Sequence, residues 1–433
     1  MKIKIGVLGA FRGSSMIHYC KNADNAEVVA ICDKSQDAID AQRELAKGLN
    51  ITFYDNFDEF IKHDMDAVVL ANYATEHAPF AIEAMKHGKH VFSEVSPVQT
   101  MKEAVELIET VEETGLVYAY GENYCYMPAP YEMKKLYNEG KIGEFEYGEC
   151  EYIHNCEKIW PSITYGEEDH WRNNMYSTYY CTHSLGPIIH ITGLRPVCVV
   201  GFEGTKNERK VRVGSKSGLF GIEMVTLENG GIVKSIHGSL YKDSVWYSIY
   251  GSKGRMESAR EDVFPKDREY IKHIYVNADE FSGQYAENNP ETYMPSMELS
   301  DAAKDFGHGG SDFYSMYHFV EKLRGNPDAD IIDVYEAMDM FLPGYFAYQS
   351  ILEGSKSKEI PDLRNKEERD KWRNFTACTD PKVAGDMLLP TRLGGTPKIS
   401  PEVYDHVKKL WEEECNKKED SYRAKAFRQQ IRK

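Results

Sequence analysis

The first 120 residues of this chain alternate short β-branched runs with amphipathic stretches, and this alternation restricts the possible folds more than any other feature. The apolar runs occupy residues 3–8, 28–31, 67–71, 90–92 and 117–119, and helical spacing fills 38–49, 57–63, 79–87 and 102–113. A regular β-α-β order predicts a parallel, doubly wound sheet with right-handed crossovers. The N-terminal third is therefore expected to be an α/β layer.

A glycine-rich turn follows the first run and indicates what this layer binds. It reads Gly6-Val-Leu-Gly9-Ala-Phe11-Arg12-Gly13, which is looser than G-x-G-x-x-G and, taken alone, equally typical of a structural turn. Asp33 ends the second run twenty residues after Gly13, where a carboxylate can accept hydrogen bonds from both hydroxyls of an adenosine ribose. Because Asp33 would also repel a 2′-phosphate, the two features together predict a domain that binds NAD rather than NADP.

Length and charge narrow the class of protein. The chain has 433 residues, enough for two or three domains that each bury a core. Its 52 Lys and Arg against 69 Asp and Glu give a formal charge of −17. Such a field repels phosphate backbones and anionic lipid headgroups, so neither nucleic acid nor a membrane surface is an expected partner. A locally basic pocket for a small anion remains compatible with this balance.

The cysteines and the first residues indicate where the chain works. Its nine cysteines include no C-x-x-C pair and lie mostly in apolar stretches, which indicates reduced thiols and no zinc or other metal site. The chain starts directly with a strand pattern, and no run of ~18 apolar residues occurs. A cytoplasmic protein is expected.

Several motifs in order resemble the glucose–fructose oxidoreductase, inositol dehydrogenase and MocA (Gfo/Idh/MocA) family across roughly residues 3–363. They are Asp66-Ala-Val-Val-Leu-Ala, His77-Ala-Pro, Ala84-Met-Lys-His-Gly-Lys-His90-Val-Phe-Ser-Glu94, Gly307-His308-Gly-Gly-Ser-Asp312, Asp333-Val-Tyr-Glu-Ala and Glu359-Ile-Pro-Asp362. The resemblance implies an N-terminal Rossmann domain, here 1–121, and a C-terminal α+β domain with an open, mostly antiparallel sheet, here 122–363. The charged remainder, 364–433, is expected to be a helical extension that packs on the body or on a neighbouring subunit.

Two positions depart from the ordinary dehydrogenases of that family. Those enzymes read Glu-Lys-Pro where this chain has Glu94-Val95-Ser96-Pro97, and they carry an Asp where Tyr179 precedes His183 by four residues. The replacements resemble the NAD-dependent glycosidase branch that includes bacterial α-N-acetylgalactosaminidase. The matching pieces are Glu122-Asn123, Tyr152-Ile-His154, His170-Trp171-Arg172 and Tyr180-Cys-Thr-His183-Ser-Leu-Gly-Pro187. A shorter spacing between Arg172 and Tyr180 suggests a different pocket wall.

The expected site residues come from these motifs and from their chemistry. Alternation along 147–154 puts Tyr152 and His154 on one face of a strand, and the aromatic-rich segment 155–182 is typical of a binding loop, with plain packing as the alternative. His183 opens a helix and could take the proton of a sugar hydroxyl. Either Tyr152 or Tyr180 could be the base at the neighbouring carbon if nearby positive charge lowers its pKa.

The complete set has a catalytic and a cofactor part. The catalytic candidates are His183, Tyr180, Tyr152, His154 and Arg172. The cofactor contacts are Gly6, Gly9, Phe11, Arg12, Gly13, Asp33, Asn72, His77, Glu94, Glu122, Asn123 and Trp171. Glu94 is expected at a cofactor ribose or at backbone amides, and His308 is either structural or catalytic.

Downstream, strands are expected at 219–227, 232–240 and 246–250, and helices at 311–323 and 334–352. A last helix is expected over 401–433, with Val403, Val407, Leu410 and Trp411 on one side.

The functional expectation is a redox-neutral glycosidase with tightly held NAD⁺, in which a sugar is oxidised at C-3, loses its aglycone, adds water and is reduced again. The first alternative is net redox chemistry, by a dehydrogenase of a sugar, inositol or sugar acid or by an oxidoreductase that forms a 3-keto-glycoside. An oxidised product that stops at elimination would make the enzyme a lyase. A non-enzymatic NAD-binding sensor is a further alternative. The substrate is expected to be a small carbohydrate or glycoside, and the resemblance implies a homodimer or homotetramer.

Overall fold

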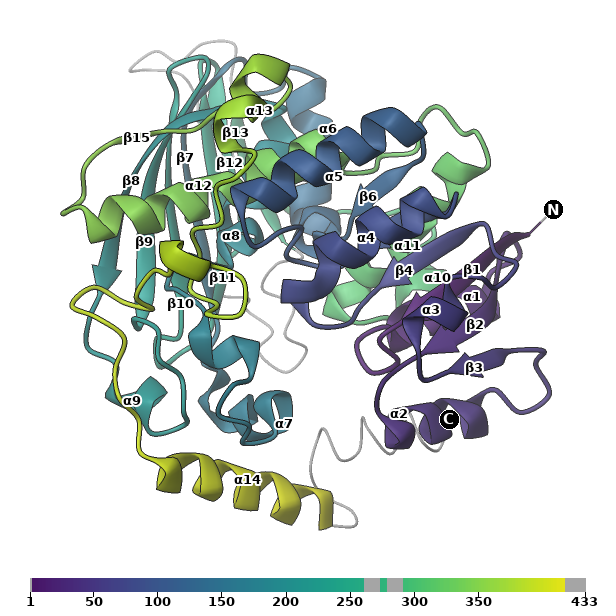
Figure 1. Cartoon of the computed structure of the whole chain (residues 1–433). Helices are drawn as coiled ribbons and strands as arrows, with labels where there is room; N and C mark the ends of the chain where they lie inside the picture. Colours follow the sequence, from purple (N-terminus) through teal and green to yellow (C-terminus); the bar gives the residue numbers. More distant parts are fainter. Residues whose placement is uncertain (1, 261–272, 279–290, 417–433) are drawn as a thin grey trace.

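The computed structural model describes residues 2–260, 273–278 and 291–416, and these form two sheets joined by helices (Figure 1). The first sheet has six strands in the order β3-β2-β1-β4-β5-β6, and every pair is parallel. This order is that of a doubly wound dinucleotide-binding sheet, which confirms the predicted α/β class. Its strands are β1 (Ile3–Leu8), β2 (Ala26–Cys32), β3 (Thr52–Tyr54), β4 (Ala67–Leu70), β5 (His90–Ser93) and β6 (Tyr118–Tyr120).

Helices cover both faces of this sheet, so its central strands read as continuous apolar runs rather than alternating ones. They are α1 (Ser14–Asn22), α2 (Gln36–Leu45), α3 (Phe57–Phe60), α4 (His77–Lys86) and α5 (Met101–Thr114). Helix α5 shows why the sequence folds this way: Thr100 accepts a hydrogen bond from the amide of Glu103 at its start, and Gly115 closes it at φ 65°. Strand β3 and helix α1 were absent from the predicted pattern.

The second sheet has nine strands in the order β14-β13-β12-β11-β7-β10-β9-β8-β15, and only β7 and β10 run parallel. The expected mostly antiparallel sheet is confirmed. Its strands are β7 (Phe145–Ile153), β8 (Pro196–Gly204), β9 (Phe220–Leu227), β10 (Ile232–Gly238), β11 (Ser244–Gly251), β12 (Gly254–Ser258), β13 (Ile274–Ala278), β14 (Glu291–Tyr293) and β15 (Lys358–Glu359). Part of the chain between β12 and β14 lies outside the described residues.

Helices α8 and α12 pack on one face of this sheet and separate it from the first sheet (Figure 1). The remaining helices are α6 (Pro128–Asn138), α7 (Trp160–Thr164), α8 (Cys181–Thr192), α9 (Glu208–Val211), α10 (Ser300–Ala303), α11 (Ser311–Leu323), α12 (Val334–Leu352), α13 (Lys366–Trp372) and α14 (Pro401–Asn416). Gly344 allows the close approach of α12, because a Cβ there would lie 2.4 Å from the Cys181 sulfur. Helix α11 returns to the first layer, where Phe313 meets Tyr19 with ring centroids 5.4 Å apart.

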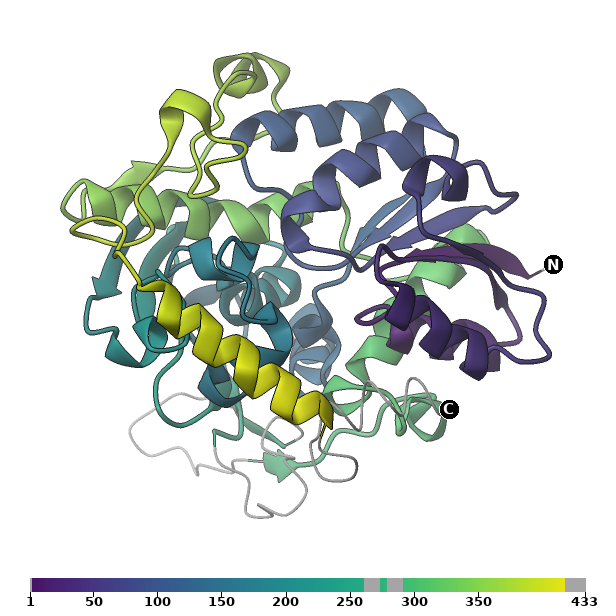
Figure 2. The same cartoon turned by 60° about the horizontal axis from the view of Figure 1, so that its bottom comes forward.

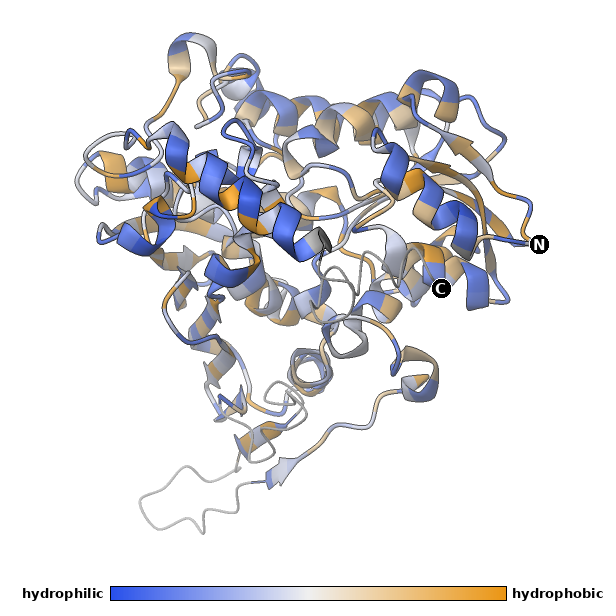
Figure 3. Ribbon diagram, turned by 90° about the horizontal axis from the view of Figure 1, so that it is seen from below, coloured by the Kyte–Doolittle hydropathy of each residue, from blue (hydrophilic) through white to orange (hydrophobic). Residues whose placement is uncertain are grey.

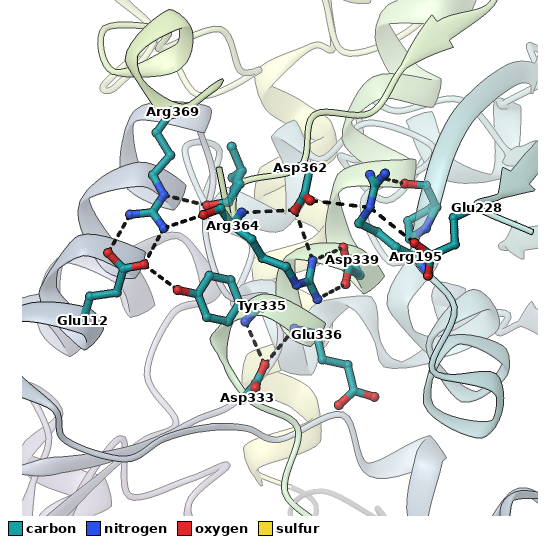
Figure 4. Close-up of polar contacts among 12 residues, drawn as sticks. Glu112, Arg195, Glu228, Asp333, Tyr335, Glu336, Asp339, Asp362, Arg364 and Arg369 are labelled. Atoms are coloured by element: carbon teal, nitrogen blue, oxygen red, sulfur yellow. Dashed lines mark hydrogen bonds and ion pairs between the residues drawn. The ribbon is translucent and has the colours of Figure 1, made fainter. Parts of the chain in front are cut away.

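A network of ion pairs, which we call the brace, joins the two layers at one end of α12 (Figure 4). Arg369 of α13 has no exposed surface, and its guanidinium donates to both carboxylate oxygens of Glu112 on α5 at 2.8 and 2.5 Å. The Tyr335 hydroxyl donates to the same carboxylate, and Arg364 pairs with Asp339 on α12 at 2.6 Å. The motifs at 333–337 and 359–362 therefore lie in or beside a structural joint.

Helix α14 lies along the segment that holds α7 (Figure 2). Tyr404 and Val407 are buried, and Val403 and Trp411 are partly covered, but Leu410 is 38% exposed. The expected apolar side was thus wrong at Leu410, because the buried side of the helix is centred closer to Tyr404. Figure 3 shows α14 as a mostly hydrophilic helix with short hydrophobic bands. The rest of the expected helix, 417–433, lies outside the described residues.

None of the helices in the described ranges is long and apolar enough to cross a membrane.

Candidate functional site

His183 lies in the first turn of α8 and is held from two directions. Its Nδ1 lies 2.8 and 3.0 Å from the two carboxylate oxygens of Glu122, which follows β6 and has no exposed surface. The hydroxyl of Tyr247 on β11 donates to the His183 carbonyl at 2.6 Å. Because Glu122 takes the Nδ1–H, Nε2 is the ring nitrogen that can accept a proton from a substrate.

Three tyrosine rings surround the His183 imidazole. The ring centroids of Tyr124, Tyr152 and Tyr180 lie 4.6, 4.7 and 5.4 Å from it, and the Tyr180 ring is nearly parallel to it at 16°. Tyr152 comes from β7, Tyr180 immediately precedes α8, and Tyr124 lies in the 3-10 turn Asn123–Tyr126. The second sheet and the end of the first thus meet at one imidazole.

The two candidate bases differ in what binds their hydroxyl groups. The Tyr152 oxygen lies 3.1 Å from Nδ1 of His154, so alternation along β7 does place these two side chains together. The Tyr180 oxygen accepts a hydrogen bond from Arg172 at 2.9 Å, and that guanidinium also lies 4.3 Å above the Trp171 ring. Burial raises the pKa of both phenols, and only at Tyr180 does a cation, Arg172, work in the opposite direction.

The glycine turn and Asp33 form the other half of the site. Gly9 has φ +93°, and a Cβ there would lie 2.4 Å from the backbone of Ala71, so the turn packs too closely for any side chain. A Cβ on Gly13 would lie 2.5 Å from the Gly9 carbonyl oxygen. The Asp33 carboxylate accepts hydrogen bonds from the amides of Ala10 and Ser35, both at 2.8 Å, and so joins the two βα turns.

These features fit a dinucleotide. The turn brings bare backbone to the start of α1, and the partly exposed Asp33 carboxylate stands at the end of the neighbouring strand. Two buried polar atoms, Oδ1 of Asn72 and Nε1 of Trp171, have no hydrogen-bond partner within the described chain and are available to a ligand. Phe11 and Arg12 belong to the same turn.

A carboxylate cluster lies between the turn and α11. Arg12 lies 2.7 Å from Glu94 and 3.1 Å from Asp312, and Asn123 donates to Asp312 at 2.8 Å. Burial works to raise the pKa of the Asp312 carboxyl, but Arg12 and His308 overcome it and hold the pKa well below its ordinary value. Glu94 was expected to contact a cofactor ribose or backbone amides, and in this structure its carboxylate pairs with Arg12. The Nδ1 of His308 lies 3.1 Å from the Asp312 carboxylate, and this contact gives the imidazole a structural role.

Two expected cofactor residues are engaged in packing. His77 is 1% exposed, and its Nδ1 lies 2.9 Å from the Ser96 carbonyl oxygen; burial is the main cause that lowers its pKa to about 4. Gly6 lies inside β1, where a Cβ would come within 2.3 Å of Met65. The Nε2 atom of His77 has no hydrogen-bond partner within the described chain, so a cofactor contact by His77 stays a prediction, as does that by Gly6.

Tyr124, Tyr247 and Asp312 were missed as site residues. Tyr124 stands directly after the noted pair Glu122-Asn123, and Asp312 ends a motif that was noted without a role. Tyr247 lies between Val245 and Ile249 on the buried side of β11, so the alternation along this strand could have shown that Tyr247 points toward the core.

Comparison with known proteins agrees with both halves of the site. Residues 3–122 match the model described as an oxidoreductase family with an NAD-binding Rossmann fold, and residues 202–373 match the C-terminal domain of glycosyl hydrolase 109. A glycosyl hydrolase family 109 protein from Solibacter usitatus is 27% identical over 86% of this chain and 89% of its own length. Glycosyl hydrolase family 109 protein 1 from Bacteroides thetaiotaomicron is 25% identical over 83% and 84%.

Solved structures show the same fold at low identity. An oxidoreductase from Agrobacterium radiobacter, in complex with NAD⁺, L-tartaric acid and magnesium, superposes with a TM-score of 0.66 at 14% identity, covering 83% of this chain and 98% of the other. Myo-inositol 2-dehydrogenase from Lactobacillus plantarum gives 0.62 at 17%, covering 83% and 100%. The chain thus combines a domain that matches the NAD-binding Rossmann model of the oxidoreductase family with one that matches the C-terminal domain of glycosyl hydrolase 109, and it is similar over most of its length to glycosyl hydrolase family 109 proteins.

Proposed function

We propose that this protein is a redox-neutral glycosidase, which cleaves a glycosidic bond by way of a transient ketone at C-3 of the sugar. The observation that carries the proposal is the buried Glu122–His183 pair with the rings of Tyr152 and Tyr180 beside it. The C-terminal domain match and the relatives' names support the same activity.

His183 is the base of the oxidation step. Its Nε2 takes the proton of the C-3 hydroxyl, and Glu122 stabilises the imidazolium that forms and fixes the orientation of the ring. When bound, NAD supplies the hydride acceptor that oxidises C-3 and returns the hydride at the end of the cycle. The rings of Tyr124, Tyr152 and Tyr180 limit the access of water to this imidazole, which is itself 8% exposed.

A tyrosine then serves the elimination. The C-3 ketone acidifies the C-2 hydrogen, because the carbanion is delocalised as an enolate. Tyr152 or Tyr180 removes that proton, a C-1–C-2 double bond forms, and the bond from C-1 to the aglycone oxygen breaks. The departing aglycone oxygen takes up a proton, water adds its hydroxyl to C-1 and releases a proton in exchange, and the tyrosine returns a proton to C-2, so that after reduction the net change is hydrolysis. Because this cycle ends with the cofactor in its original state, we expect the enzyme to hold NAD⁺ tightly.

The test uses purified protein and a panel of nitrophenyl α- and β-glycosides in deuterated buffer, with nitrophenol and reduced-nicotinamide absorbance followed together. Nitrophenol release without net accumulation of NADH, and with deuterium at C-2 of the released sugar, is the expected result. Steady accumulation of NADH with the glycosidic bond intact would replace the proposal by net dehydrogenation. Release of an unsaturated sugar would make the enzyme a lyase.

Two further features of this proposal concern the setting of the enzyme. The eight cysteines whose side chains the structure describes are thiols, which supports a reducing compartment such as the cytoplasm.

The outer face of the nine-stranded sheet carries Phe202, Ile232 and Tyr250, which are 47%, 41% and 41% exposed, and we expect a second copy of the chain to cover it.

A further inference from the structure

Two cations beside the site have no carboxylate partner. Arg172 contacts the Tyr180 hydroxyl and the Trp171 ring, and Lys210 of α9 donates to the Ser217 hydroxyl at 2.7 Å. Among the described residues, no carboxylate oxygen lies within 4 Å of either charge, whereas other cations at the two layers, such as Arg12 and Arg364, form such pairs. Both are partly buried, where an unneutralised charge is costly.

Helix α9 lies next to the end of strand β10, which pairs with the strand that carries Tyr152. Arg209 of α9 donates to the carbonyl of Ser239 at 3.0 Å, directly after β10. The amide of His154 donates to the carbonyl of Gly238 at 2.8 Å, and His237 pairs in register with Tyr152. Lys210 and His183 both act on His237, so the Lys210 charge reaches the part of the sheet that carries Tyr152.

His237 lies beside Tyr152 on the neighbouring strand and has a ring nitrogen without a partner within the described chain. It is 4% exposed, and its Nε2 has no hydrogen-bond partner within the described chain. Burial, the Lys210 charge and His183 together lower the pKa of His237 to about 3. The imidazole is therefore neutral at physiological pH, and its free nitrogen is available to a ligand that Lys210 attracts.

The Glu203 carboxylate acts on Lys210 but forms no ion pair with it. Glu203 accepts a hydrogen bond from the amide of Leu393 at 2.6 Å, and burial raises its pKa above the ordinary value. Arg392, whose guanidinium donates to Asn207 at 2.8 Å, acts on the same carboxylate. Burial lowers the pKa of Lys210 to about 8, whereas hydrogen bonding to Asp64 raises the pKa of Lys4, which has a true partner.

We propose that the sugar pocket has an anion subsite, with Lys210 as its charged contact and His237 beside it, which selects substrates that carry a carboxylate or a sulfate ester. The inference rests on the proposed function of the same pocket and names its substrate class. An anion placed there would pair with a cation that the chain leaves without a counter-charge, and such charge-assisted hydrogen bonds are about twice as strong as neutral ones.

The test is equilibrium binding by calorimetry to the NAD-loaded enzyme, which requires no turnover. Glucuronate, galacturonate and glucose 6-sulfate are compared with glucose and galactose at low and at high salt. We expect the charged sugars to bind about tenfold more tightly than the neutral ones at low salt, with the difference reduced at high salt. If only the sulfate, or only the uronates, show this preference, the outcome identifies the anion. Equal binding of charged and neutral sugars overturns the proposal.

Two lysine variants test whether Lys210 causes the preference for charged sugars. Lys210→Met is expected to remove most of the preference, while the matched variant of an exposed lysine four residues earlier, Lys206→Met, keeps it. An unchanged preference in Lys210→Met would also overturn the assignment, and NAD binding by both variants shows that they are folded. Binding preference without cleavage of any glycoside would leave the subsite standing and remove the glycosidase function. Cleavage of a glycoside without a binding preference for charged sugars would overturn the subsite and leave the glycosidase function standing.

Discussion

The rings of Tyr152 and Tyr180 lie beside the same imidazole, but their hydroxyl groups have different neighbours. Tyr180 receives a hydrogen bond from the Arg172 guanidinium, and Tyr152 is bonded to the imidazole of His154. Burial raises the pKa of both phenols, and the permanent charge of Arg172 opposes this effect at Tyr180, so Tyr180 is the better base for the C-2 proton once substrate excludes water.

Tyr180→Phe should abolish deuterium exchange at C-2 while the oxidation at C-3 still occurs. We expect exchange to fall by roughly 10²–10⁴-fold, the usual worth of a positioned base, and reduced nicotinamide to appear in a single turnover. Tyr152→Phe is the matched variant and should retain exchange. The opposite result would assign the base to Tyr152.

The pH dependence gives an independent check on that assignment. Removing the cation in Arg172→Met raises the pKa of Tyr180 further above its ordinary value, because burial then acts unopposed. A base works only when deprotonated, so the rising limb of C-2 exchange against pH should move to higher pH. A rising limb at the same pH in Arg172→Met would show that Tyr180 is not the group that titrates.

At this scale the sequence predicts which residue types carry the chemistry but not all of their contacts. The proximity of Tyr152 and His154 follows from strand alternation over two residues. The pairing of His183 with Glu122 spans 61 positions, and that of Arg12 with Asp312 spans 300. Contacts at such separations depend on how α8 and α11 pack, which local periodicity does not encode.

Among the elements, strand β9 carries an acid where a core residue is expected. Glu223 has no exposed surface and lies on the helix-covered face of the sheet, opposite Ser235 of β10. Burial raises the pKa of this carboxyl to about 8. The folded protein therefore keeps a proton that the unfolded chain releases near pH 4.5.

Glu223→Gln should stabilise the protein in a pH-dependent way. Below pH 4.5 both states hold the proton and the acid carries no penalty; as pH rises towards 8 the unfolded state alone ionises, which favours unfolding. The glutamine side chain does not ionise in either state, so the variant escapes this loss. Its gain in unfolding free energy over the native chain should therefore grow between about pH 4.5 and 8, to on the order of 3 kcal/mol. Urea unfolding at pH 5 and pH 8 measures it, with the exposed Glu27→Gln as control. An equal effect at both pH values would contradict the prediction.

Element prediction succeeded where the periodicity was long enough. The helices at 311–323 and 334–352 are confirmed to the residue, because each has more than three turns of apolar spacing and a change of pattern at both ends. Strand β3 has three residues and β15 two, too few to establish a period of two. Helix α1 follows the glycine turn directly, and its buried residues are mixed with polar ones.

Across the whole molecule, the brace around Arg369 joins the two layers (Figure 4). Arg369→Met leaves the Glu112 carboxylate without its bidentate partner, although this carboxylate keeps 30% of its side-chain surface in water. We expect a loss of about 2–3 kcal/mol in unfolding free energy, less than for a fully buried pair. Arg373→Met removes the neighbouring, more exposed pair with Glu109 and should leave the unfolding midpoint nearly unchanged. Equal losses in the two variants would show that burial of Arg369 is not what makes its pair matter.

The contact between α7 and α14 has a consequence for natural variation in this protein. Gly166 has φ +72°, and a Cβ there would lie 2.4 Å from the backbone nitrogen of Lys408, while Tyr165 meets the Trp411 ring at 5.4 Å. The aromatic segment and the C-terminal helix therefore pack as one unit. We expect that replacing either segment alone with that of a relative would disturb this contact, whereas exchanging both together would keep it.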